Sequence, residues 1–181
     1  MKKTFYLCLL LLCVSCATNT EKGIVQNETS NGLTTTVFEE YGFSITTPCV
    51  LEDALSGVRD LVQGSNIDAC HVGIENPDDS VNTAAYQVTV IKLPTSLKDE
   101  QKTEFIKNIE NVRLAGFTNV EKVEFSDNKY PGFVGDIDKN GCKNRVVLFI
   151  KDKQVIELMV STNTGLDEKF KSFTDSFKVI D

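Results

Sequence analysis

The chain has 181 residues, of which 41% are hydrophobic and 25% are charged, and its formal net charge is −7. This composition is that of an ordinary globular protein of one domain, and it excludes collagen-like, wholly disordered and polytopic membrane proteins. The acidic balance argues against sequence-independent nucleic-acid binding, which needs clustered lysine and arginine side chains to neutralise phosphates. We therefore expect no nucleic-acid partner.

The beginning of the chain has the pattern of a bacterial lipoprotein signal. Two lysines precede an apolar run over 5–12 that is too short to span a bilayer as a helix. The following Cys13-Val14-Ser15-Cys16 resembles a lipobox, with Cys13 where lipoboxes usually carry Leu. The resemblance implies a signal peptide over 1–15 and a lipid on the Cys16 thiol, which would anchor the protein to a cell-envelope membrane, at its periplasmic face or at the cell surface. An ordinary secretory signal cleaved nearby is the alternative.

The segment after the signal is polar and has no sustained hydrophobic period. Residues 16–36 are rich in Thr, Asn, Ser and Gly, so they bury too little apolar surface to offset the entropy of ordering. We interpret 16–36 as the lipidated cysteine and a flexible tether. The remaining residues, 37–181, are enough for a single domain with one hydrophobic core.

Strands and a helix are predicted in the first half of this domain. Two short strands are expected over 37–46, and further strands over 68–74 and 85–93, because apolar and β-branched residues alternate there. A helix is expected between Ser96, a suitable N-cap, and Gly116, a suitable stop.

The second half predicts an antiparallel meander and a closing helix. Its strands are expected over 120–125, 132–138, 145–150 and 154–160, with a type I′ hairpin turn at Asn140-Gly141. The strand over 145–150 is almost continuously apolar, as expected for a strand buried on both faces. A helix begins near Thr164 and places three aromatic side chains at helical spacing toward the sheet: Phe170, Phe173 and Phe177.

This order of elements resembles the PsbP-like fold. The residues that carry the resemblance are 41–48 (YGFSITTP), the meander over 120–160 and the closing segment 170–179. The resemblance implies an α+β domain with a central antiparallel β-sheet flanked by helices, an α/β/α sandwich. Proteins of that fold mostly bind other proteins and share no catalytic set, so it implies a protein partner in the envelope and no enzyme activity.

Three cysteines remain in the domain after the signal and the lipidated residue are set aside. An exported protein meets an oxidising compartment, where cysteines tend to pair. Among the three single pairings that Cys49, Cys70 and Cys142 allow, we favour a disulfide between Cys49 and Cys70, which would contribute about 3 kcal/mol by closing the loop between them. The alternative is three reduced, buried thiols.

Nucleophilic catalysis by a Cys-His pair is not expected. Cys70 is adjacent to His71, the one histidine of the chain, but neighbours on a strand point to opposite faces of the sheet. Cys142 could meet His71 only through the fold. We therefore predict no catalytic residues.

The most specific local motif is Asp136-Ile137-Asp138-Lys139-Asn140-Gly141. It matches the first six positions of an EF-hand calcium loop, whose oxygen ligands surround one cation. The glutamate required at position twelve is replaced by Val147, so we favour an ordinary polar hairpin tip. A weak calcium site at Asp136, Asp138 and Asn140 is the alternative, and we expect no other cofactor.

These observations predict a membrane-anchored, non-enzymatic binding or accessory module of the cell envelope. The alternatives are a small-ligand or calcium-dependent binding lipoprotein and, less favoured, a hydrolase with a cleft between helix and sheet. A pocket lined by converging polar side chains would favour the alternatives.

Overall fold

The computed structural model describes residues 25–55, 67–93, 116–139 and 141–180. The predicted signal peptide, Cys16 and the helix expected between Ser96 and Gly116 lie outside these residues. The strands and helices in chain order are β1 (Val25–Ser30), β2 (Leu33–Phe38), η1 (Glu39–Tyr41), β3 (Phe43–Thr47), β4 (Glu52–Asp53), β5 (Ile67–Glu75), β6 (Ala84–Lys92), β7 (Thr118–Glu124), α4 (Phe125–Asn128), β8 (Tyr130–Lys139), β9 (Cys142–Lys151), β10 (Gln154–Thr162), α5 (Leu166–Asp175) and β11 (Lys178–Val179).

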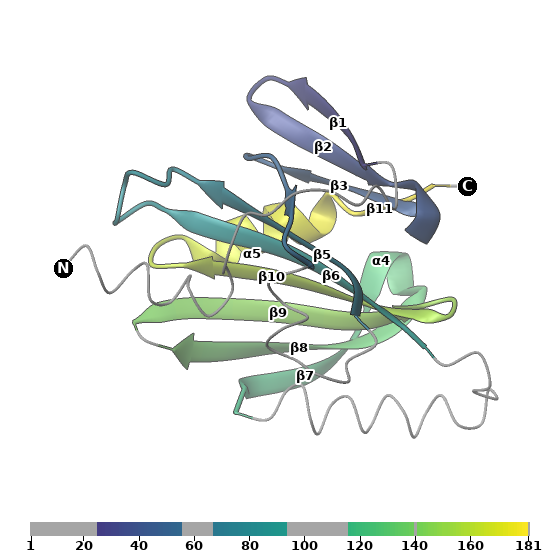
Figure 1. The fold of residues 1–181 in the computed structure, drawn as a ribbon. Helices are drawn as coiled ribbons and strands as arrows, with labels where there is room; N and C mark the ends of the chain where they lie inside the picture. Colours follow the sequence, from purple (N-terminus) through teal and green to yellow (C-terminus); the bar gives the residue numbers. More distant parts are fainter. Residues whose placement is uncertain (1–24, 56–66, 94–115, 140, 181) are drawn as a thin grey trace.

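The described strands form two antiparallel sheets (Figure 1). The large sheet has the order β4-β5-β6-β10-β9-β8-β7, and the small sheet has the order β1-β2-β3-β11. The strands predicted over 68–74, 85–93, 120–125, 132–138, 145–150 and 154–160 are confirmed as β5 to β10. Each is extended by one to three residues at one end or both, and β6 and β7 end one residue before the predicted end. The expected pair of strands near 37–46 is confirmed as β2 and β3, with η1 and Gly42 between them.

Two tight turns fix the register of the meander. Lys139 pairs with Cys142 across the predicted Asn140-Gly141 turn, where Gly141 has a φ of 81°. Lys151 pairs with Gln154 across the next turn, where Asp152 has a φ of 56°. Positive φ values at such positions match the right-handed twist of the two strands, so each turn sets which residues face each other along the whole hairpin.

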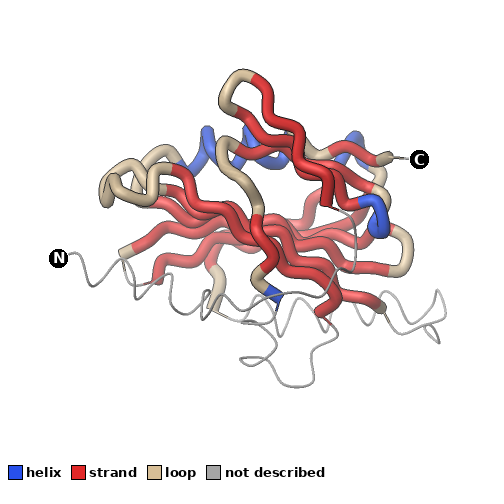
Figure 2. The backbone as a smooth tube through the Cα atoms, turned by 45° about the horizontal axis from the view of Figure 1, so that its top comes forward, coloured by secondary structure: helices blue, strands red, loops and turns tan. Residues whose placement is uncertain are grey.

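Alternation along the strands gives the large sheet two apolar faces. One face packs against the small sheet and α5, which both lie on the same side of it (Figure 2). Its largest fully buried side chains come from all three parts: Phe38, Phe43 and Ile45 from β2 and β3, Phe149, Ile156 and Leu158 from β9 and β10, and Phe173 from α5. The other face carries a second apolar cluster: Ile67, Cys70, Val72, Ile91, Leu93, Phe133, Val146, Leu148 and Val155.

The closing helix packs as its spacing predicts. Phe173 and Phe177 are buried, Phe170 is half-buried, and all three belong to the cluster under α5. Its N-cap is Gly165, with a φ of 65°, and not the expected Thr164. Thr164 instead uses its hydroxyl to donate a hydrogen bond to the Val81 carbonyl, 3.4 Å away.

The predicted tether over 16–36 is wrong in its second half. Residues 25–36 form β1 and most of β2, joined by a turn at Asn31-Gly32 in which both φ values are positive. The prediction took the many threonines as a sign of a disordered segment, but their hydroxyl groups form hydrogen bonds within the small sheet. Thr36 is fully buried and donates a hydrogen bond to Asn27 Oδ1 at 2.9 Å.

The predicted α+β class with an antiparallel sheet is confirmed. The expected helical cover is confirmed on one face, where α5 is the one helix longer than a single turn within the described residues. The second helical layer of an α/β/α sandwich would come from the helix after Ser96, which lies outside those residues. Much of the cover over the first face is the small sheet, which the sequence did not predict.

We predict that Gly73→Ala lowers the free energy of unfolding by about 2 kcal/mol. A Cβ at Gly73 would lie 2.6 Å from the Val50 carbonyl oxygen and 2.7 Å from Cys49 Sγ, so the segment after β3 would have to move away from β5. Urea unfolding measures the loss. Gly135→Ala is the matched control on β8: its nearest neighbour, a methyl group of Val120 at 3.3 Å, can shift, and we expect less than half the effect. Equal losses in both variants would contradict this account.

Candidate functional site

A trough runs between α5 and strands β7 to β9. Helix α5 packs on β10, β9 and β3, and its side chains form one wall. The floor consists of β8 and β9, because Val134 and Asp136 pair directly with Val147 and Arg145 and all four share the helix-covered face. Two cavities, of about 430 and 600 Å³, lie one after the other along this trough.

The smaller cavity is aromatic. Its walls include Phe125, Phe170 and Phe177, and its rim carries Ser126, Thr174 and two carboxylates, Glu124 and Asp175. The single-turn helix α4 positions Phe125 so that its ring stacks on Phe149 with 4.1 Å between centroids. Volume and lining are those of a small-molecule site, in which apolar walls supply affinity and a few polar groups fix orientation.

The larger cavity is polar and centres on Arg145. The Arg145 Nε and Nη2 donate to the two carboxylate oxygens of Asp136, at 2.6 and 3.2 Å, and Nη1 donates to Asp167 Oδ1 at 2.5 Å. Its guanidinium also lies 5.7 Å from the centre of the Phe170 ring, at the boundary between the two cavities. Asp136 and Asp167 therefore hold Arg145 in one position, where it separates the aromatic end from the polar end.

The residues of the calcium motif are only partly brought together. Asp136 and Asp138 both line the polar cavity, and Asn140 lies outside the described residues. Both Asp136 oxygens accept from Arg145, and this bond holds the pKa of the Asp136 carboxyl below its usual value. Among the described residues, no group of three or more His, Cys, Asp and Glu side chains is placed to hold a metal ion. The engagement of Asp136 by Arg145 favours the polar hairpin tip, and the choice between this tip and a weak calcium site stays a prediction.

The expected disulfide between Cys49 and Cys70 is not formed, and no disulfide occurs among the described cysteines. Cys70 points into the cluster on the face away from α5, whereas Cys49 packs against the cluster under α5. The strand that carries Cys70 therefore separates the two thiols. Because side chains alternate between faces, a bridge would require β5 to shift by one residue.

The Cys49 thiol lies beside a half-buried ion pair. Lys169 Nζ donates to Glu75 Oε2 at 2.6 Å, and Tyr86 Oη donates to the same carboxylate oxygen at 3.0 Å. Burial, with a further contribution from Glu75, raises the pKa of Cys49 to about 12. A thiol that stays protonated at neutral pH is a poor nucleophile, so this arrangement does not favour chemistry at Cys49.

His71 lies in the core, on the face of the large sheet that also packs against Cys49. Its ring meets Phe38 edge-on with 5.0 Å between centroids, under the small sheet. The adjacent Cys70 and, by strand register, Cys142 are on the opposite face of the large sheet, which confirms that neither shares a face with His71. His71 Nδ1 is buried and has no hydrogen-bond partner among the described residues, and burial lowers the pKa of the imidazole.

Sequence reasoning missed Arg145 and the aromatic cavity. A two-residue turn at Asn140-Gly141 places Arg145 directly opposite Asp136 on the neighbouring strand, so this ion pair could have been predicted from the sequence. No such local signal exists for the cavity, because Phe125 and Phe170 meet only through packing of α5 on the sheet.

Comparisons with known proteins find a likeness in structure and none in sequence. No family model matches the chain, and no curated protein matches it. The solution structure of cyanobacterial PsbP (CyanoP) from Synechocystis sp. PCC 6803 is similar, with 13% sequence identity and a TM-score of 0.45, over 92% of this chain and 98% of that chain. We base no functional conclusion on this likeness. Within the described ranges, no helix is both long and apolar enough to cross a membrane.

We predict that millimolar calcium leaves the melting temperature unchanged, because Arg145 already occupies both oxygens of Asp136. Differential scanning calorimetry with calcium and with chelator checks this. A calcium-dependent rise that disappears in Asp136→Asn/Asp138→Asn would restore the calcium site.

We predict that His71 makes the protein less stable as the pH falls from 7.5 to 5.5. The unfolded chain begins to bind a proton near 6.5, whereas the buried imidazole, whose pKa is lower, binds it less readily. Protonation therefore favours unfolding below 6.5, with a loss at pH 5.5 of at most about 1.4 kcal/mol. Urea unfolding across this range measures the loss. His71→Gln should show a smaller decline, and an identical decline in both proteins would assign the effect to other groups.

Proposed function

We propose that the protein is a lipid-anchored lipoprotein of the cell envelope whose domain is a non-enzymatic binding module. The site is the trough between α5 and β7 to β9, and the ligand is a small amphipathic molecule. The observation that carries this proposal is the aromatic cavity of about 430 Å³, which adjoins a second, polar cavity. A protein partner in the envelope is the function expected from the sequence, and it could use the same trough.

The lining of the trough supports an amphipathic ligand. The aromatic end offers ring faces and edges to an apolar group, with burial contributing about 25 cal/mol per Å² of apolar surface. The polar end is lined by Asn119 and Asn144, whose amide nitrogens already donate to Asp136 and to backbone carbonyls, and by the exposed Lys143. The charges of Arg145 and Asp136 neutralise each other, but the remaining carboxylates of the lining, from Asp138, Asp167 and Glu168, outnumber the ammonium of Lys143. The polar end is therefore net acidic, and we expect it to disfavour anionic groups.

The same groups support binding rather than catalysis. The carboxylates that surround Arg145 are engaged by it, and the thiol of Cys49 is kept protonated by burial. Anchoring is supported by the lipobox-like Cys13-Val14-Ser15-Cys16 after a short apolar run. A lipid anchor would hold an acidic protein at a membrane whose surface charge does not attract it.

We predict that Thr174→Trp weakens binding of the apolar fluorescent probe N-phenyl-1-naphthylamine by about tenfold or more. Thr174 lines the aromatic cavity, and an indole at this position would fill the space that the probe needs. Ser172→Trp is the matched control, because Ser172 is exposed on the same helix and does not line the cavity. Fluorescence titration measures both variants.

The proposal predicts equal probe affinity in wild type and Ser172→Trp. It fails if the wild-type protein does not bind the probe, or if Thr174→Trp binds it as well as the control does. Circular dichroism melts of the two variants show that the loss is local. Native mass spectrometry of the protein from envelopes identifies a retained small molecule directly, and crosslinking there would instead reveal a protein seated in the trough.

A further inference from the structure

We propose that one end of the domain rests on the lipid headgroups of the membrane that holds the anchor. This end consists of η1, the turn between β9 and β10, and β11, and we refer to it as the η1 end. The inference depends on the proposed lipidation of Cys16 and adds to it the orientation of the domain and the surface that meets the bilayer.

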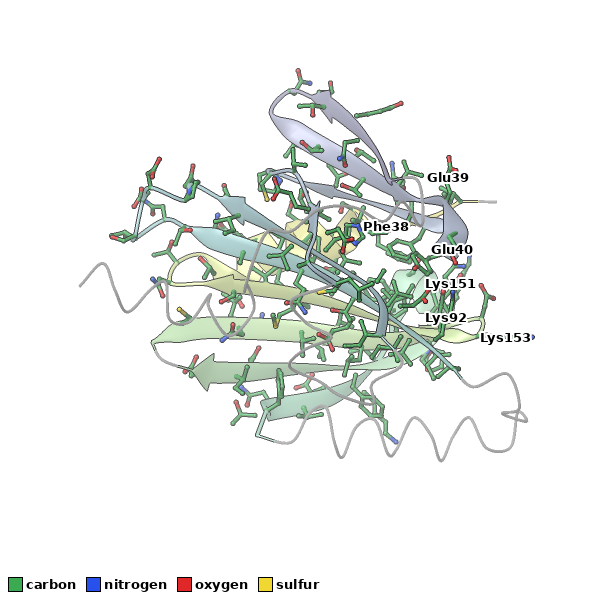
Figure 3. All side chains as sticks on the ribbon, in the orientation of Figure 1. Phe38, Glu39, Glu40, Lys92, Lys151 and Lys153 are labelled. Carbon is green, nitrogen blue, oxygen red and sulfur yellow. The ribbon has the colours of Figure 1, made fainter. Side chains whose placement is uncertain are left out.

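The chain joins the described domain at the η1 end. Strand β1 begins at Val25, which pairs with Phe38, the residue immediately before η1. Figure 3 shows Phe38, Glu39 and Glu40 beside Lys92, Lys151 and Lys153. Contacts join these parts firmly: Lys92 Nζ lies 3.1 Å from Glu40 Oε1, and Lys151 Nζ donates to the Tyr41 carbonyl at 3.3 Å.

The chain between the anchor and β1 is short. From Cys16 to Val25 there are nine residue steps, which reach about 32 Å when fully extended. As a flexible coil, the same segment has a root-mean-square length of about 17 Å. The tether that the sequence suggested, extending to residue 36, would have been more than twice as long, so β1 and β2 bring the domain closer to the membrane.

The opposite end of the domain cannot easily reach the same membrane. The turn between β5 and β6 lies at the far end of β6, whose nine residues span about 26 Å. For that turn to touch the bilayer, the start of β1 would have to stand nearly a full domain length away. This would stretch the tether close to its limit and cost most of its conformational entropy.

The composition of the η1 end suits a headgroup surface. The whole chain carries a net charge of −7, whereas the η1 end and the strand ends beside it are nearly balanced: Lys92, Lys151, Lys153 and Lys178 lie there with Glu39, Glu40, Asp53, Asp68 and Asp152. Lys151 is buried, and its ammonium is engaged by the Tyr41 carbonyl and Asp152, so Lys92, Lys153 and Lys178 are the lysines that a headgroup could meet. An anionic leaflet would therefore repel this end less than the rest of the acidic domain. Val179, 40% exposed on β11, adds an apolar side chain next to Lys178, and lysine stems can cover apolar surface while their ammonium groups reach phosphates.

Paramagnetic broadening from labelled lipids tests this orientation without changing the protein. The full chain, isotope-labelled and processed in cells, is reconstituted in nanodiscs of phosphatidylethanolamine and phosphatidylglycerol that contain a gadolinium-chelating headgroup lipid. We expect several-fold stronger broadening of the amides of Glu40, Lys153 and Val179 than of Ser80 and Gly141. The mass of the N-terminal peptide reports in the same sample whether Cys16 carries lipid.

Variants separate the tether from the surface. A long Gly/Ser insertion after Gly23 should shrink the contrast between the two ends, because a longer tether no longer restricts the domain. Lys153→Glu should reduce broadening at Val179, whereas Lys143→Glu, an exposed lysine on β9 near the opposite turn, should not.

Each outcome decides between the two proposals. Lipidated protein with equal broadening at both ends, or with stronger broadening at Ser80, overturns the orientation and leaves the anchor standing. A contrast that is unchanged by the insertion overturns the role of the short tether. Unmodified Cys16 overturns the anchor, and this inference with it. Lipidated protein with broadening confined to the η1 end supports both.

Discussion

The alternation of side chains in the large antiparallel sheet is the constraint on which the remaining features depend. Tight turns at Gly141 and Asp152 fix the register of β8, β9 and β10, and each pair then places its side chains together on one face. One face of the sheet becomes the floor under α5 and the small sheet, and the other carries a separate apolar cluster. The same rule keeps Cys70 apart from both Cys49 and His71, so neither a disulfide nor a Cys-His pair forms.

This register explains why the trough is apolar at one end and charged at the other. Along the helix-covered face of β9, the side chains change from Phe149 and Val147 to Arg145 and Lys143, in steps of two residues. This order of side chains places the cationic Arg145 beside the apolar cavity. Asp136 on the next strand and Asp167 on α5 form ion pairs with Arg145 and hold it there. Since an Arg-carboxylate pair keeps its planar geometry, it forms a fixed partition rather than a mobile charge.

The sequence predicted most strands and the packing of the last helix because these depend on local periodicity. It failed at β1 and at the first four residues of β2, where buried threonines carry the alternation. Asn31-Gly32 is nevertheless the same turn signal as the one recognised at Asn140-Gly141. The Cys49–Cys70 disulfide was wrong because loop length says nothing about which face each thiol occupies. The aromatic cavity could not be predicted from the sequence, because it depends on how α5 packs on the sheet and how much of β8 it leaves open.

The proposed ligand trough and the proposed membrane-facing surface lie close together at the η1 end of the domain. Phe149, which packs under Phe125 beside the aromatic cavity, is two residues from Lys151, and Lys151 contacts the backbone of Tyr41 at the η1 end. The aromatic part of the trough is therefore nearer than its charged part to the surface that we propose faces the lipid. An amphiphile that leaves the bilayer with its apolar end first would meet the aromatic rings before the Arg145 partition, and its apolar group would bind nearer the membrane than its polar group. A ligand arriving from the aqueous side would meet the polar cavity first, so the direction of approach determines which groups of the trough select it.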